Sequence, residues 1–125
     1  MLKTISPIDN SVYLERPYAS SSEIENVLEQ SNQSKIVWKN TSLVERKELV
    51  SRFVDSFLSN NKEIEEELCR QMGRPISQCS GEMRGFEERA KYMIENADRA
   101  LQKVISKNDS EFDNYVVKDP LGTIF

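Results

Sequence analysis

The chain has 125 residues, which suits one domain at most, and its 38% apolar and 30% charged residues are typical of helices with one buried stripe and a broad solvated face. A net charge of −4 argues against nucleic acid and anionic membranes as partners, because phosphate binding needs a concentrated basic patch. No run reaches the roughly 20 apolar residues that a membrane span requires, and the start of the chain lacks a signal-peptide pattern. We therefore expect a reduced, cytoplasmic protein.

The first segment, residues 4–18, reads as two short extended pieces around a turn. Ser6 to Ser11 is rich in turn formers, and Val12 begins the second piece. Pro7 and Pro17 restrict both pieces to edge positions, because proline cannot donate a backbone hydrogen bond. This pattern predicts an N-terminal β-hairpin.

Three helices are predicted next, at approximately 20–38, 42–58 and 60–72. The pairs Ser20–Glu23 and Ser42–Glu45 have the spacing of capping boxes, and Asn60 with Glu63 repeats the start signal. The second helix carries an apolar stripe at helical spacing, which predicts an unbroken buried face. That stripe consists of Leu49, Val50, Phe53, Val54, Phe57 and Leu58. Ile64, Leu68 and Met72 are expected to face inward from the third helix.

A sharp corner is predicted at Gln71 to Pro75. Gly73 can leave a helix in a left-handed conformation, and Pro75 suits the first turn of the next helix. The fourth helix is expected at 76–104, with Cys79, Met83, Phe86, Ala90, Met93, Ile94, Ala97, Leu101 and Val104 on one face. A polar loop at 106–110 and a strand at 112–118 should follow. We expect residues 115–118 of that strand to lack their proper neighbours and to be left unpaired.

The order of these elements resembles the NAD(P)-dependent aldehyde dehydrogenase family from end to end. The matching residues are Ser6-Pro7, Trp38, Glu45-Arg46, Gln71-Met72-Gly73-Arg74-Pro75, Glu82, Tyr92 and Pro120-Leu121-Gly122. Each match is weak alone, but their order and spacing cover the whole chain. The resemblance implies an α/β family fold, of which this chain would be a mainly helical N-terminal fragment with a hairpin, four helices and a C-terminal strand. Residues 1–125 would then end before the nucleotide-binding motif and the catalytic domain.

The resemblance also implies oxidation of an aldehyde to a carboxylic acid with NAD or NADP. In that family a Cys thiolate forms a thiohemiacetal, a Glu activates water, and an Asn amide with a backbone N–H holds the oxyanion. Those residues would follow position 125, so we assign no catalytic, cofactor-binding or metal residue here. We expect the chain alone to bind no cofactor and to be inactive. Some members hold a monovalent cation, but the acidic position corresponds to Gln71, which argues against that site.

Several residues invite a functional interpretation that a structural one outweighs. Cys69 and Cys79 lie on helical stripes in a chain without any His, which favours packing over nucleophilic catalysis, and a bridge between them would be unusual in the cytosol. The carboxylates between Glu63 and Glu67 point in different directions around a helix and do not converge, so a solvated face is favoured over a cation site. Trp38 is expected to pack between helices. Arg74 follows the C-terminus of the third helix, where a positive charge interacts favourably with the helix dipole.

Three functional hypotheses follow. The first is the aldehyde dehydrogenase fragment, which as a complete enzyme would take an aldehyde substrate and form a homo-oligomer. The second is a non-catalytic helical interaction module whose stripe from Leu49 to Leu58 binds a partner. The third, a small independent enzyme, has no nucleophile–base pair or metal cluster in its favour. For the isolated chain we expect marginal stability, with Phe53→Asp as the most damaging change.

Overall fold

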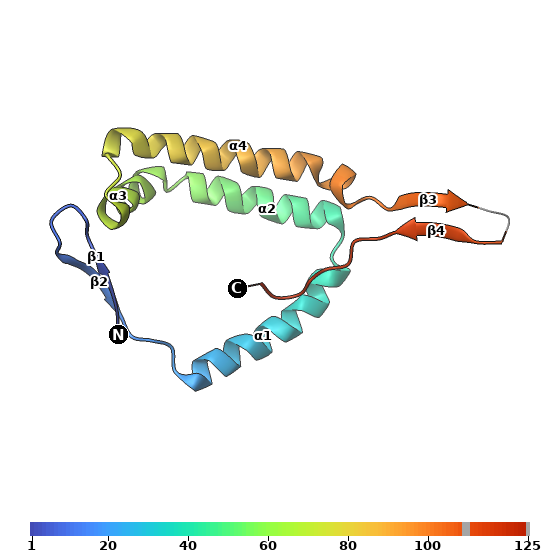
Figure 1. Ribbon diagram of the computed structural model, residues 1–125, viewed down its shortest axis with the longest axis horizontal. Helices are drawn as coiled ribbons and strands as arrows, with labels where there is room; N and C mark the ends of the chain where they lie inside the picture. The colour runs from blue at the N-terminus through green and yellow to red at the C-terminus, as the bar shows by residue number, and fades with distance from the viewer. Residues whose placement is uncertain (109–110, 125) are drawn as a thin grey trace.

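The computed structural model describes residues 1–108 and 111–124. Its elements in chain order are β1 (Leu2–Ile5), β2 (Val12–Arg16), α1 (Ser21–Asn40), α2 (Leu43–Leu58), α3 (Asn61–Met72), α4 (Ile76–Leu101), β3 (Val104–Asn108) and β4 (Asp113–Val116). Helices α2 and α4 run side by side, whereas α1 lies apart from them and the β3–β4 hairpin projects away (Figure 1). The hairpin, the four helices and the C-terminal strand are therefore all present.

Helices α1 and α2 begin where the sequence predicted, because both capping boxes form. The Ser20 Oγ accepts from the Glu23 N–H at 3.3 Å, while the Glu23 carboxylate accepts from the Ser20 N–H at 2.8 Å. The same exchange joins Ser42 and Glu45 at 3.2 and 3.0 Å. The backbone and side chain of Ser20 lower the pKa of Glu23, and Ser42 lowers that of Glu45 in the same way.

The third helix also begins where its start signal predicted, at Asn61, but without the expected side-chain cap. Asn60 precedes α3 but makes no side-chain cap. Its amide instead donates to the Ser56 carbonyl at 2.9 Å, which also accepts from the Ser59 hydroxyl at 2.7 Å, so both side chains help to end α2. Only two residues separate α2 from α3, and the Asn60 side chain caps the end of α2 rather than the start of α3.

The hairpin β1–β2 is antiparallel, with Lys3 opposite Glu15 and an irregularity between Thr4 and Ile5. Lys3 and Glu15 form an ion pair at 2.7 Å. In the turn, Ser6 is buried, and its N–H donates to the Ser11 carbonyl at 2.9 Å. These contacts confirm the predicted hairpin and show what holds its turn.

The core lies between α2 and α4, with α3 packed against the start of α4. Its buried apolar residues are Val54, Cys79 and Met83. The rings of Phe57 and Phe86 extend this contact, with centroids 4.6 Å apart. The core is small because α2 is covered on one side only.

The predicted apolar stripe is therefore only partly buried. Val54 is 3% exposed, whereas Phe53 is 58% exposed and Leu49 is 47% exposed. Adjacent helical residues point about 100° apart, so a single covering helix buries one of each pair. Met72 and Met93, both expected to face inward, are also exposed. The premise that Phe53→Asp places a charge in a buried stripe was therefore wrong, because Phe53 is mainly exposed.

The C-terminal region differs most from the prediction. Helix α4 ends at Leu101, and Val104, expected as its last inward residue, begins β3. Strand β4 pairs antiparallel with β3, so the expectation that the last strand lacks a neighbour was wrong for β4. The Lys103 ammonium lies 3.2 Å from the centre of the Tyr115 ring, which adds a cation–π contact to the hairpin. Of the loop expected at 106–110, residues 106–108 belong to β3, and 109–110 lie outside the described residues.

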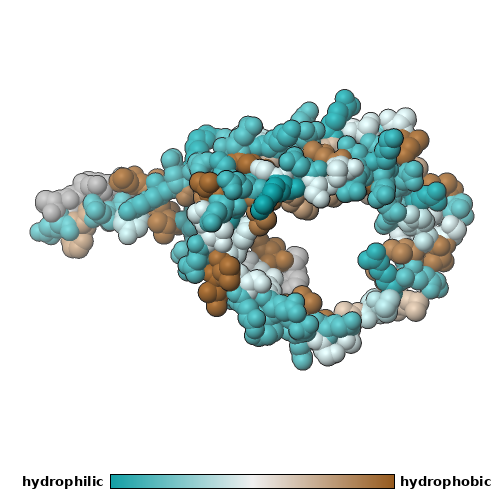
Figure 2. Space-filling view, turned by 180° about the vertical axis from the view of Figure 1, so that it is seen from behind, coloured by the Kyte–Doolittle hydropathy of each residue, from teal (hydrophilic) through white to brown (hydrophobic). Residues whose placement is uncertain are grey.

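After β4 the chain turns back toward α1 (Figure 1), where the hydroxyl groups of Ser31 and Thr123 are hydrogen-bonded. The Lys118 ammonium donates to the Ala100 carbonyl at the end of α4. The β1–β2 hairpin and helices α1, α2 and α3 surround an opening (Figure 1), and Figure 2 shows this passage with apolar patches on its rim.

Candidate functional site

The corner between α3 and α4 is the motif that sequence singled out, and its geometry is structural. Gly73 has φ +72°, the left-handed conformation that favours glycine, and its N–H donates to the Cys69 carbonyl at 2.9 Å. A Cβ at Gly73 would lie 2.8 Å from Cγ of Pro7. The turn of the first hairpin therefore packs against this corner. Glycine is required there for two reasons, its positive φ and the lack of space for a Cβ.

Arg74 and Glu82, two matches to the family, meet beside this corner. Their side chains form an ion pair at 2.8 Å, in which both groups are partly exposed. The expected effect of Arg74 on the helix dipole is thus accompanied by a specific partner on the next helix. This pair ties the loop to α4 and offers no reacting group.

Cys79 does not have the surroundings of a nucleophile. Its side chain is fully buried, and its thiol donates to the Pro75 carbonyl at 3.5 Å. Burial raises the pKa of this thiol, with a smaller contribution from Cys69, so the reactive thiolate is disfavoured. Cys69 is partly exposed, and both cysteines are free thiols. Both placements fit the packing roles expected from the sequence.

A hydrogen-bonded cluster that the sequence did not predict links β2 to α3. The Tyr13 hydroxyl donates to the Glu67 carboxylate at 2.6 Å, and the Gln71 amide donates to the other carboxylate oxygen. The bond from Tyr13 lowers the pKa of Glu67 and raises that of Tyr13. Arg70 lies 5.9 Å from the Tyr13 ring. Glu67 is thus committed to Tyr13 and Gln71 rather than merely solvated, and 54 residues of separation left no local signal for this contact.

The remaining acidic residues of α3 were expected to form a solvated face. Among the residues that the structure describes, no group of three or more potential metal-binding side chains is found. The Gln71 side chain is an amide that donates to the Glu67 carboxylate. Within the described chain there is also no helix long and apolar enough to cross a bilayer.

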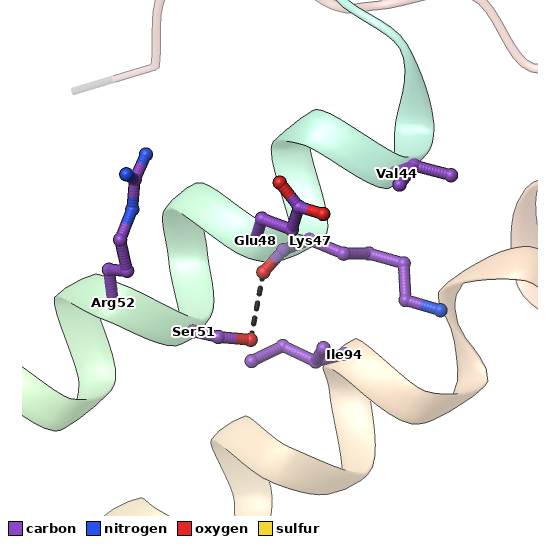
Figure 3. Close-up of a pocket in the computed structure, with 6 residues that line it drawn as sticks. All are labelled: Val44, Lys47, Glu48, Ser51, Arg52 and Ile94. Carbon is purple, nitrogen blue, oxygen red and sulfur yellow. Dashed lines mark hydrogen bonds between the residues drawn. The ribbon is translucent and has the colours of Figure 1, made fainter.

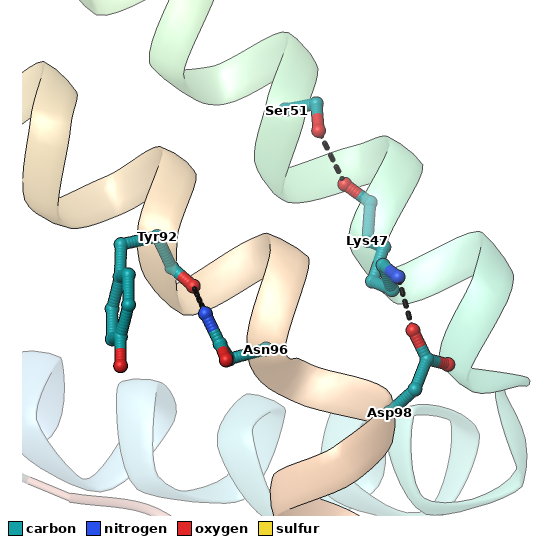
Figure 4. Close-up of polar contacts among 5 residues, drawn as sticks. All are labelled: Lys47, Ser51, Tyr92, Asn96 and Asp98. Carbon is teal, nitrogen blue, oxygen red and sulfur yellow. Dashed lines mark hydrogen bonds and ion pairs between the residues drawn. The ribbon is translucent and has the colours of Figure 1, made fainter.

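A shallow hollow of about 500 Å³ lies on α2 beside Ile94 of α4 (Figure 3). Two of its polar side chains are engaged: Lys47 forms an ion pair with Asp98, and the Ser51 hydroxyl donates to the Lys47 carbonyl at 2.8 Å (Figure 4). On α4 the Asn96 amide donates to the Tyr92 carbonyl at 2.8 Å. The Lys47–Asp98 ion pair joins α2 to α4, whereas the other two hydrogen bonds each lie within one helix.

A larger groove, which we call the 118–124 groove, has a volume of about 860 Å³. It is lined by Lys35, Trp38, Lys39, Leu43, Arg46, Leu101, Lys118, Asp119, Pro120, Leu121, Gly122 and Ile124. The Arg46 guanidinium lies 5.9 Å from the Trp38 ring, so Trp38 packs against the start of α2, as expected. The groove combines cations with aliphatic surface and contains no nucleophile with a base.

The sequence model of the aldehyde dehydrogenase family matches residues 1–125, the whole chain. The chain belongs to this family. The 3-sulfolactaldehyde dehydrogenase of Pseudomonas putida is 24% identical to it over 106 residues, which are 85% of this chain and 22% of that enzyme. The chain therefore spans less than a quarter of that relative.

Solved structures agree on the fold. A succinic semialdehyde dehydrogenase from Streptococcus pyogenes, in complex with NADP+, superposes with a TM-score of 0.82 at 22% identity, covering 92% of this chain and 25% of that one. A NAD-dependent benzaldehyde dehydrogenase from Corynebacterium glutamicum superposes at 0.77 with 22% identity, covering 93% and 25%. The aldehyde dehydrogenase arrangement predicted from the corner and its flanking helices is thereby confirmed, and the chain length fits the expected N-terminal portion.

Proposed function

We propose that this chain supplies the N-terminal part of an NAD(P)-dependent aldehyde dehydrogenase, which oxidises an aldehyde to a carboxylic acid. In this proposal the nucleophilic Cys, the catalytic Glu and the cofactor-binding loop are provided by residues that follow position 125 in the complete enzyme. The role of residues 1–125 is to build a helical support, held by the corner at Gly73 and the Tyr13–Glu67 contact.

One observation carries the proposal that the chain alone is inactive. Cys79 is fully buried, and its raised thiol pKa is the opposite of what thiohemiacetal formation requires. Cys69 has no base to activate it, because the chain contains no His. Two free thiols also support a reducing compartment such as the cytoplasm.

The proposal includes a homo-oligomer for the complete enzyme. Large apolar side chains are exposed at many positions, among them Phe53 at 58% and Leu121 at 91%. Such surface favours burial against further protein, whether the rest of the enzyme or another subunit. The same exposure supports the second candidate, a non-catalytic interaction module that binds a partner through α2.

The test compares two proteins made from the same gene: residues 1–125, and the product of the reading frame extended beyond codon 125. Each is incubated with a panel of aldehydes and either NAD+ or NADP+, and reduced nicotinamide is followed by its absorbance. We expect activity only from the longer protein. Saturable turnover by residues 1–125 would refute the proposal, and a stop codon directly after codon 125 would favour the interaction module.

A further inference from the structure

We draw no further inference here: the strongest candidate, the pair of free thiols formed by Cys69 at the end of α3 and Cys79 at the start of α4, carries no redox site, because the two are linked only through the contribution of Cys69 to the raised pKa of Cys79, which does not place their sulfur atoms within bonding distance.

Discussion

Val54 offers the sharpest test of where the core lies. Val54→Ala removes apolar volume equivalent to two methylene groups from a side chain that is 3% exposed. At about 0.8 kcal/mol per buried methylene the transfer term is ~1.6 kcal/mol, and the residual cavity brings the cost to about 2 kcal/mol. Ala has a higher helix propensity than Val, which offsets part of this cost in a single-variant measurement.

Val44→Ala is the matched control, because Val44 lies on the same helix and is 62% exposed. The gain in helix propensity is common to both variants, so it cancels in their difference. We expect Val54→Ala to unfold about 2 kcal/mol more easily than Val44→Ala in urea, which corresponds to a melting temperature lower by roughly 6–12 °C for a chain of this size. Equal stability of the two variants would show that α4 does not cover the Val54 side of α2.

The glycines and thiols give three further predictions. Gly73→Ala should destabilise the chain by about 1–2 kcal/mol or more in urea unfolding, because its φ is +72° and the new Cβ would meet Pro7. Gly81→Ala, in a helix with open space around it, should stabilise the chain by up to about 1 kcal/mol. A change of the same sign in both variants would contradict the left-handed conformation and close contact at Gly73. Iodoacetamide should modify Cys69 under native conditions and Cys79 only after unfolding, as peptide mass mapping can show. Burial raises the pKa of Cys79 above 9.0, so the unfolded chain releases that proton first, and the free energy of unfolding should fall as pH rises through and beyond this value. Denaturant titrations at several alkaline pH values should show a shallower fall for Cys79→Ala, and an unchanged slope would refute this assignment.

Local sequence signals predicted the helix starts because their partners are three residues away. Ser20 and Ser42 each find a Glu at that spacing, and both capping boxes form as expected. Gly73 likewise acts through its own backbone conformation, which depends on its missing Cβ rather than on distant contacts. These features could be predicted because the interactions that create them are complete within one turn of the chain.

Features that depend on tertiary packing could not be predicted in the same way. The periodicity of α2 identifies an apolar stripe but not which part of it a neighbouring helix covers, so Phe53 and Val54 look equivalent in sequence. The end of α4 was missed because Val104 continues the helical spacing, although Val and Ile also favour strands and a partner was available in β4. The contact between Tyr13 and Glu67 joins segments 54 residues apart and has no local signature.

The order in which the elements pack has a consequence during synthesis. The principal contacts join β1 to β2, α3 to α4, and β3 to β4, and α2 to α4 is the one main pairing that spans another element. Such topology has low contact order, so little loop-closure entropy must be overcome before native contacts form. The unit from α2 to α4 is complete once Leu101 has left the ribosome, and the first hairpin can already seat against the Gly73 corner by then. Residues 1–101 can thus assemble cotranslationally, before the β3–β4 hairpin has emerged from the ribosome.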